Sequence, residues 1–157
     1  MVWNRLMAYF RRKFSATSHA SLGLPRLVEP RESITRFLHS SEHFAATTGR
    51  VKGPAIAPRF SPTSGQFETS VYRAIGAASK ELWDICSARV DQPATQRIMK
   101  ARGTCSAQAM FDEKLTFDAD GRPHPRHANV VAWPDAKNER KIVQQKIAAS
   151  MTLEIRP

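Results

Sequence analysis

The chain contains 157 residues, of which 41% are apolar and 24% are charged, a balance typical of a folded globular domain rather than a disordered chain. It has two cysteines, Cys86 and Cys105, and no apolar run of about 18 residues, which argues against a disulfide framework and a membrane-spanning helix. The net charge of +10 at pH 7 favours a polyanionic partner.

The positive charge is concentrated at the start of the sequence, where no acidic residue precedes Glu29. Residues 1–16 place their apolar side chains within one arc at about 100° per residue, so we expect a basic amphipathic helix. This helix and the linker after it form a first region, 1–31, ahead of a folded domain, 32–157. Residues 2–14 would then dock on a larger protein partner or on the chain's own core.

Two other interpretations of this N-terminal region stay open. Peripheral contact with a membrane is one, although we do not favour it. A mitochondrial presequence over residues 1–18 is the other, because the segment is basic, contains serine and lacks acids. We expect a cytoplasmic location, or the mitochondrial matrix if the presequence interpretation holds.

Region 32–157 mixes helical and extended patterns, which predicts an α+β domain. We expect an antiparallel or mixed sheet of about four strands packed by two to three helices. The predicted helices are 34–44, 80–90 and 136–151, the last with Ile142, Val143, Ile147 and Met151 facing inward. The predicted extended segments are 67–73, 104–110, 114–117 and 127–133, with a short helical turn at 95–100.

Polar side chains gather where the predicted strand 127–133 begins. Alternation along the strand places His127 and Asn129 on one face, and the prolines around His124 put its ring in the entering loop. Two imidazoles beside a guanidinium are what phosphodiester transfer requires, as base, acid and charge stabiliser. The candidate catalytic residues are therefore His124, Arg126, His127 and Asn129. In the competing, structural interpretation, Arg126 and His127 tie the loop to carbonyl groups and Asn129 satisfies a turn.

A second histidine pair lies at His39 and His43, with Glu42 between them. This spacing resembles the H-x-x-E-H motif of inverzincin metalloproteases, which implies a zinc hydrolase site on a helix with His39, Glu42 and His43 at the metal. No further acidic ligand can be assigned. The alternative is that His43, Arg36 and Arg50 face the His127 pocket and hold a phosphate there.

The segment Phe67–Arg73 resembles the strand that carries the first NAD-contacting arginine of ADP-ribosyltransferase and related toxin domains. The resemblance covers a few residues. It implies a role for Arg73 in NAD binding, with Glu154 as the available glutamate.

Taken together, these patterns predict a small basic protein that binds a polyanion, RNA or DNA, without a cofactor. The alternatives are a metal-independent ribonuclease or phosphodiesterase of the toxin or defence type, and a non-enzymatic interaction subunit of a larger complex. The predicted nucleic-acid-binding residues are Arg5, Arg11, Arg12, Lys13, Arg36, Arg50, Lys52 and Arg73.

Overall fold

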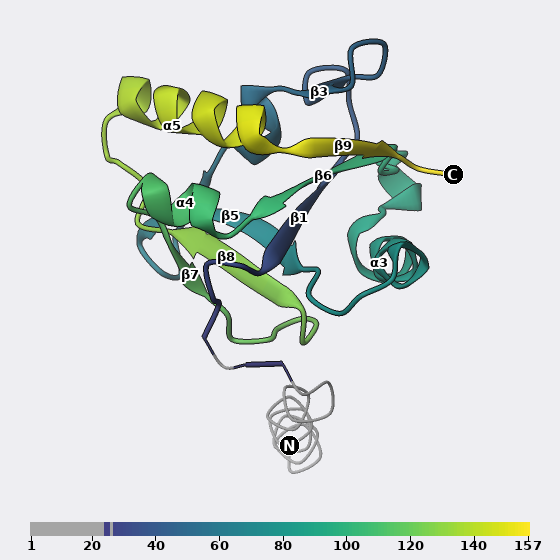
Figure 1. Cartoon of the computed structure of the whole chain (residues 1–157), viewed down its shortest axis with the longest axis horizontal. Coiled ribbons are helices and arrows are strands. Elements are labelled where there is room, and N and C mark those ends of the chain that lie inside the picture. Colours follow the sequence, from purple (N-terminus) through teal and green to yellow (C-terminus); the bar gives the residue numbers. More distant parts are fainter. Residues whose placement is uncertain (1–23, 26) are drawn as a thin grey trace, which may run out of the picture.

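Seven strands form one antiparallel sheet in the computed structural model, which describes residues 24–25 and 27–157 (Figure 1). The predicted N-terminal helix lies outside the described residues. The order across the sheet is β7-β8-β5-β1-β6-β9, and β4 also pairs with β5. The strands are β1 (Ser33–Leu38), β4 (Arg59–Ser61), β5 (Gln66–Arg73), β6 (Ala101–Ser106), β7 (Thr116–Asp118), β8 (His127–Val131) and β9 (Thr152–Ile155).

The remaining elements are helices and one small hairpin, formed by β2 (Phe44–Ala45) and β3 (Arg50–Val51). The three α-helices are α3 (Ser79–Ile85), α4 (Gln108–Asp112) and α5 (Lys137–Ser150). A π-helical segment η2 (Cys86–Val90) continues α3, and 3-10 turns form at η1 (Gly53–Ile56) and η3 (Pro93–Thr95). None of the described helices has the length and hydropathy needed to cross a membrane.

The sheet is covered on both faces, because neighbouring residues of its strands enter different cores. On one face, Ile34, Val71 and Ala128 pack with α4, α5 and η1. On the other face, Phe37 and Tyr72 pack with α3 and η2. Figure 1 shows α5 and α3 on separate sides of the strands. The α+β architecture is therefore as predicted, but the sheet has seven strands where about four were expected.

The predicted helix 34–44 is wrong, since Ser33–Leu38 forms β1 and a turn follows it. The apolar residues at positions 34, 37 and 38 have the spacing of one face of a helix, which explains the wrong prediction. In fact β1 is central in the sheet, pairing with both β5 and β6, so Ile34 enters one core and Phe37 the other. A central strand with both faces buried lacks the polar alternation that identifies a half-exposed strand.

The C-terminal segment agrees with prediction except at Ile142 and after the end of α5. Val143 and Ile147 are buried four residues apart in α5, and Met151 follows them, as expected. Ile142 was expected to face inward but is 52% exposed, because it lies about 100° around the helix from Val143. The strand β9, which follows α5 directly, was not predicted.

Smaller differences concern strand ends. The strand 67–73 is confirmed as β5, and 127–133 is confirmed as far as Val131. Ala132 has a φ of 65°, in the left-handed region, which ends β8 and turns Trp133 into the core. The predicted extension to Met110 is wrong, since β6 ends at Ser106 and α4 begins at Gln108.

Candidate nucleic-acid interface

Two adjoining hollows open on the side of the sheet where Ser70 and Tyr72 lie. Their volumes are about 220 and 290 Å³, and Arg36, Ser70 and Arg97 line both of them. We call the combined surface the arginine groove. Its lining includes Arg36, Arg59, Phe60, Glu68, Ser70, Tyr72, Arg89, Gln92, Arg97, His127 and Asn129.

The four arginines of the groove come from separate parts of the chain, namely β1, β4, η2 and the segment before β6. None of them forms an ion pair with a carboxylate of the described residues, and residues 1–23 and 26 contain no Asp or Glu. Elsewhere in the fold, four fully or partly buried arginines have carboxylate partners, whereas Arg140 donates to the carbonyls of Pro134 and Asp135. The four are Arg73, Arg102, Arg126 and Arg156.

Three of the groove arginines, Arg36, Arg59 and Arg97, are close enough for Arg36 to be repelled by the other two. Burial lowers the pKa of Arg36 to about 10, and the charges of Arg97 and Arg59 contribute to this shift. Arg36 donates to the carbonyls of Ala55 at 3.2 Å and Ser70 at 2.6 Å, which fixes its guanidinium but does not neutralise it. The buried Nε of Arg97 has no hydrogen-bond partner among the described residues. A bound anion would relieve the repulsion between these positive charges.

His127 lies beside Ser70 within this groove. Its Nε2 is 2.5 Å from the Ser70 hydroxyl oxygen, and its ring is 5.5 Å from the Tyr72 ring. Burial lowers the pKa of His127, although Asp120 opposes the shift. The imidazole is therefore neutral near pH 7 and can accept a proton.

The predicted catalytic set is only partly brought together. His127 and Asn129 line the groove, and the His124 ring lies 6.4 Å from that of Tyr72. Arg126 is buried instead, where its side chain donates to Glu81 and to the carbonyls of Arg73 and Ile75. Its backbone N–H donates to Nδ1 of His124. Arg126 thus holds the loop, as in the structural interpretation of this segment.

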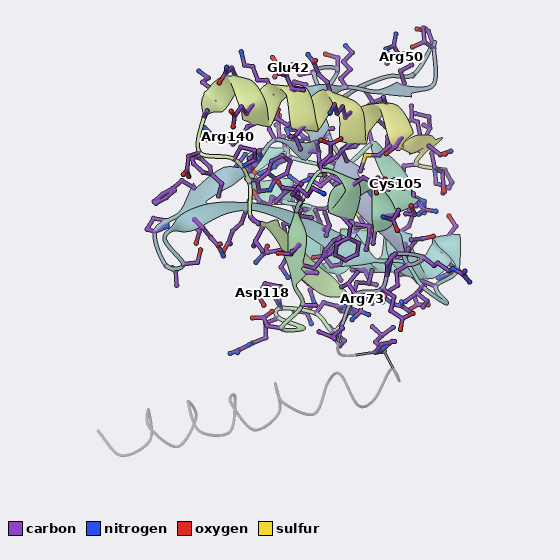
Figure 2. The ribbon with its side chains drawn as sticks, turned by 60° about the vertical axis from the view of Figure 1, so that its left-hand side comes forward. Glu42, Arg50, Arg73, Cys105, Asp118 and Arg140 are labelled. Atoms are coloured by element: carbon purple, nitrogen blue, oxygen red, sulfur yellow. The ribbon has the colours of Figure 1, made fainter. Side chains whose placement is uncertain are left out.

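The predicted nucleic-acid-binding residues do not share one surface. Arg36 lines the groove, whereas Arg50 and Lys52 line a separate cavity of about 680 Å³ between the β2–β3 hairpin and α5. That cavity is lined by two basic residues, whereas four arginines and His127 line the groove, so the groove is the better candidate site. Arg73 is fully buried and offers no surface to a ligand. Figure 2 shows Arg50 and Arg73 at opposite ends of the molecule. The basic residues Arg5, Arg11, Arg12 and Lys13 lie outside the described residues.

The helix required by the inverzincin motif is absent, because residues 39–43 form a turn after β1. The rings of His39 and His43 are 4.6 Å apart. No cluster of three or more His, Cys, Asp or Glu suited to a metal occurs within the described ranges. Burial lowers the pKa of His43, with His39, Arg36 and Arg97 contributing, but His43 lines neither hollow of the groove and Arg50 lines the separate cavity.

The residues of the ADP-ribosyltransferase resemblance have structural partners. Arg73 forms an ion pair with Glu32, and Glu154 pairs with Arg102 and accepts from Ser79 and Trp83. Arg73 lies on β5 and Glu154 on β9, with β1 and β6 between these strands. The two residues therefore do not form a common site.

Sequence reasoning missed most of the groove. Alternation along β5 does place Ser70 and Tyr72 on one face, so this pair could have been noted. Arg59, Arg89 and Arg97 carried no such signal, because only the tertiary fold brings them together.

Comparison of the chain with protein-family models, curated proteins and solved structures gives no match.

The histidines predict how stability depends on pH. Burial lowers the pKa of His43 to about 4, and lowers those of His39, His124 and His127. The unfolded chain therefore binds more protons than the folded one as the pH falls below about 6.5, so acidification destabilises the fold. Between about pH 7.5 and 5, we expect His43 to contribute on the order of 1 kcal/mol to this loss, allowing for solvent screening.

Thermal melting at both pH values checks this prediction. His43→Gln, which cannot take up a proton, should show a smaller loss of melting temperature than the wild type, by about 2 to 4 °C. An equal loss in the two proteins would contradict the assignment.

Proposed function

We propose that this protein binds single-stranded nucleic acid, with phosphate groups of the strand in the arginine groove. The observation that carries the proposal is that Arg36, Arg59, Arg89 and Arg97 line one surface without a carboxylate partner from the described residues. Phosphate oxygens supply the missing negative charge, and the planar guanidinium group binds them in a bidentate manner. The net charge of +10 adds long-range attraction.

An exposed aromatic ring supports a single strand as the ligand. Phe60 lines the groove beside Arg59, is 56% exposed, and rests against Phe67 with 5.5 Å between ring centroids. Arg140 covers the Phe67 ring at 3.8 Å and so supports this aromatic pair. A base freed from a duplex can stack on such a ring, at about 1 to 3 kcal/mol per base.

The N-terminal region has a secondary place in this proposal. Its arginines and Lys13 would extend the contact with the phosphate backbone beyond the groove. The alternative role as an interaction subunit assigns residues 2–14 to a protein partner instead. Loss of nucleic-acid binding on substitution of the groove tests the groove alone, because the groove variants leave residues 2–14 intact.

The direct test is the affinity of the full chain for a fluorescent single strand of about 12 nucleotides, measured by anisotropy at about 100 mM salt. The test variant is Arg59→Gln/Arg89→Gln/Arg97→Gln. The matched control is Lys114→Gln/Lys137→Gln/Lys141→Gln, which removes the same charge from exposed positions away from the groove. We expect the groove variant to bind about 30-fold or more weakly, and the control within about threefold of the wild type.

Phe60→Ala gives a second measurement on the same strand. We expect a loss of about 5-fold to 100-fold, corresponding to one lost stacking contact. Equal affinities for the groove variant and its control would refute the proposal, as would a wild type that binds no single strand at all.

A further inference from the structure

The hydroxyl of Ser70 and the imidazole of His127 are the two reactive groups in direct contact within the arginine groove. They come from adjacent strands, β5 and β8, in which Ser70 pairs with Asn129 and Tyr72 with His127. Their side chains therefore lie on the same face, and the Oγ–Nε2 distance is 2.5 Å. Ser70 also lines both hollows of the groove, where the proposed function places the bound strand.

The surroundings suit a nucleophile and its base. His127 is only 7% exposed, and burial lowers its pKa, so the neutral ring is available to take a proton. The base role requires the ring proton on Nδ1, which is buried without a hydrogen-bond partner among the described residues, and the lone pair of Nε2 then faces the serine hydroxyl. A serine activated by an adjacent histidine is the arrangement used in nucleophilic catalysis.

Positive charge is present where a reacting phosphate would develop negative charge. The Arg36 guanidinium donates to the carbonyl of Ser70 itself, at 2.6 Å. Arg97 lines both hollows beside Ser70 and forms no ion pair with a carboxylate of the described residues. Fixed donors of this kind stabilise a transition state more than the ground state.

We propose that Ser70 is a nucleophile and His127 its general base in the cleavage of a phosphodiester bond of the bound strand. This inference rests on the proposed function, because the substrate is the nucleic acid held in the groove. It assigns catalysis to a serine that the sequence patterns did not single out, in place of Arg126 and His124.

The reaction has two steps. In the first, Ser70 Oγ bonds to phosphorus, its proton passes to His127 Nε2, and the bond from phosphorus to the leaving oxygen breaks as that oxygen takes the proton. In the second, a water oxygen bonds to phosphorus, His127 takes a proton from the water, and the bond to Ser70 Oγ breaks as the proton returns to the serine. The net change is hydrolysis of one ester bond, without a metal or redox partner.

The test uses the full chain with fluorescent 12-nucleotide strands of RNA and of DNA. Cleavage is followed by electrophoresis, and intact mass followed by peptide mapping detects a phosphoryl adduct on Ser70. We expect cleavage of both strands, because a serine nucleophile does not need the 2′-hydroxyl. Ser70→Ala should bind within about threefold of the wild type and cleave about a thousandfold or more slowly. His127→Ala should cleave about 100-fold to 10,000-fold more slowly.

Ser106→Ala, an exposed serine of the same sheet, is the matched control and should cleave at the wild-type rate. A wild type that binds the strand but neither cleaves it nor forms an adduct would overturn the inference while leaving the proposed function intact. The inference would also be overturned if the protein cleaves RNA but not DNA, and if the Ser70→Ala variant retains that RNA cleavage. If no strand binds, the proposed function fails as well. The adduct measurement needs no variant, so it decides the question even if Ser70→Ala does not fold.

Discussion

Replacing Glu32 with alanine is expected to lower the free energy of unfolding by about 3 to 5 kcal/mol, the largest effect on stability that a single ion pair of this fold should give. Glu32 accepts from Arg73 through both carboxylate oxygens, at 2.8 and 2.5 Å. The two side chains are 2% and 0% exposed, so removal of the carboxylate leaves a buried positive charge without its partner. The carbonyls of Pro25 and Leu27 also accept from Arg73, but they carry no charge.

Urea unfolding of the variant checks this value against a matched exposed pair. Lys80 and Asp84 form an ion pair four residues apart on α3, with side chains 85% and 65% exposed. Asp84→Ala should therefore cost about 0.5 kcal/mol or less. If Glu32→Ala lowers the free energy of unfolding as little as Asp84→Ala does, the buried ion pair does not stabilise the contact between Glu32, which precedes β1, and Arg73 of β5.

Elements with a clear local pattern could be predicted from the sequence. β5 and β8 alternate between core and groove positions, and α5 buries Val143 and Ile147 along one stripe. β1 could not, because its position between β5 and β6 buries residues on both faces. β9 is short and follows α5 directly, so no turn sequence separates them.

The candidate site was harder to predict than the fold. Arg126 and His127 are adjacent in the sequence, which led to their assignment to one pocket. Successive residues of an extended chain point in opposite directions, and only His127 reaches the groove. The arginines that do line the groove are separated by up to 61 positions, from Arg36 to Arg97, and no local pattern connects them.

The charge of the groove also predicts a large effect of salt on binding. Each phosphate neutralised on a single strand contributes a slope of about −0.7 to the logarithm of affinity against the logarithm of salt concentration. With three to four phosphates bound in the groove, affinity should fall about 20-fold to 50-fold between about 50 and 200 mM salt. Contacts from the N-terminal arginines would add to this slope without changing the difference between groove variants.

The slope itself is the most direct test of the central claim that the unpaired groove arginines hold phosphates. It is measured by titrating the 12-nucleotide strand at several salt concentrations with the wild type, the Arg59→Gln/Arg89→Gln/Arg97→Gln variant and the Lys114→Gln/Lys137→Gln/Lys141→Gln control. We expect the groove variant to lose about 2 units of slope, as three phosphate contacts require, and the control to keep the wild-type slope. An unchanged slope in the groove variant, or an equal loss in the control, would contradict the claim.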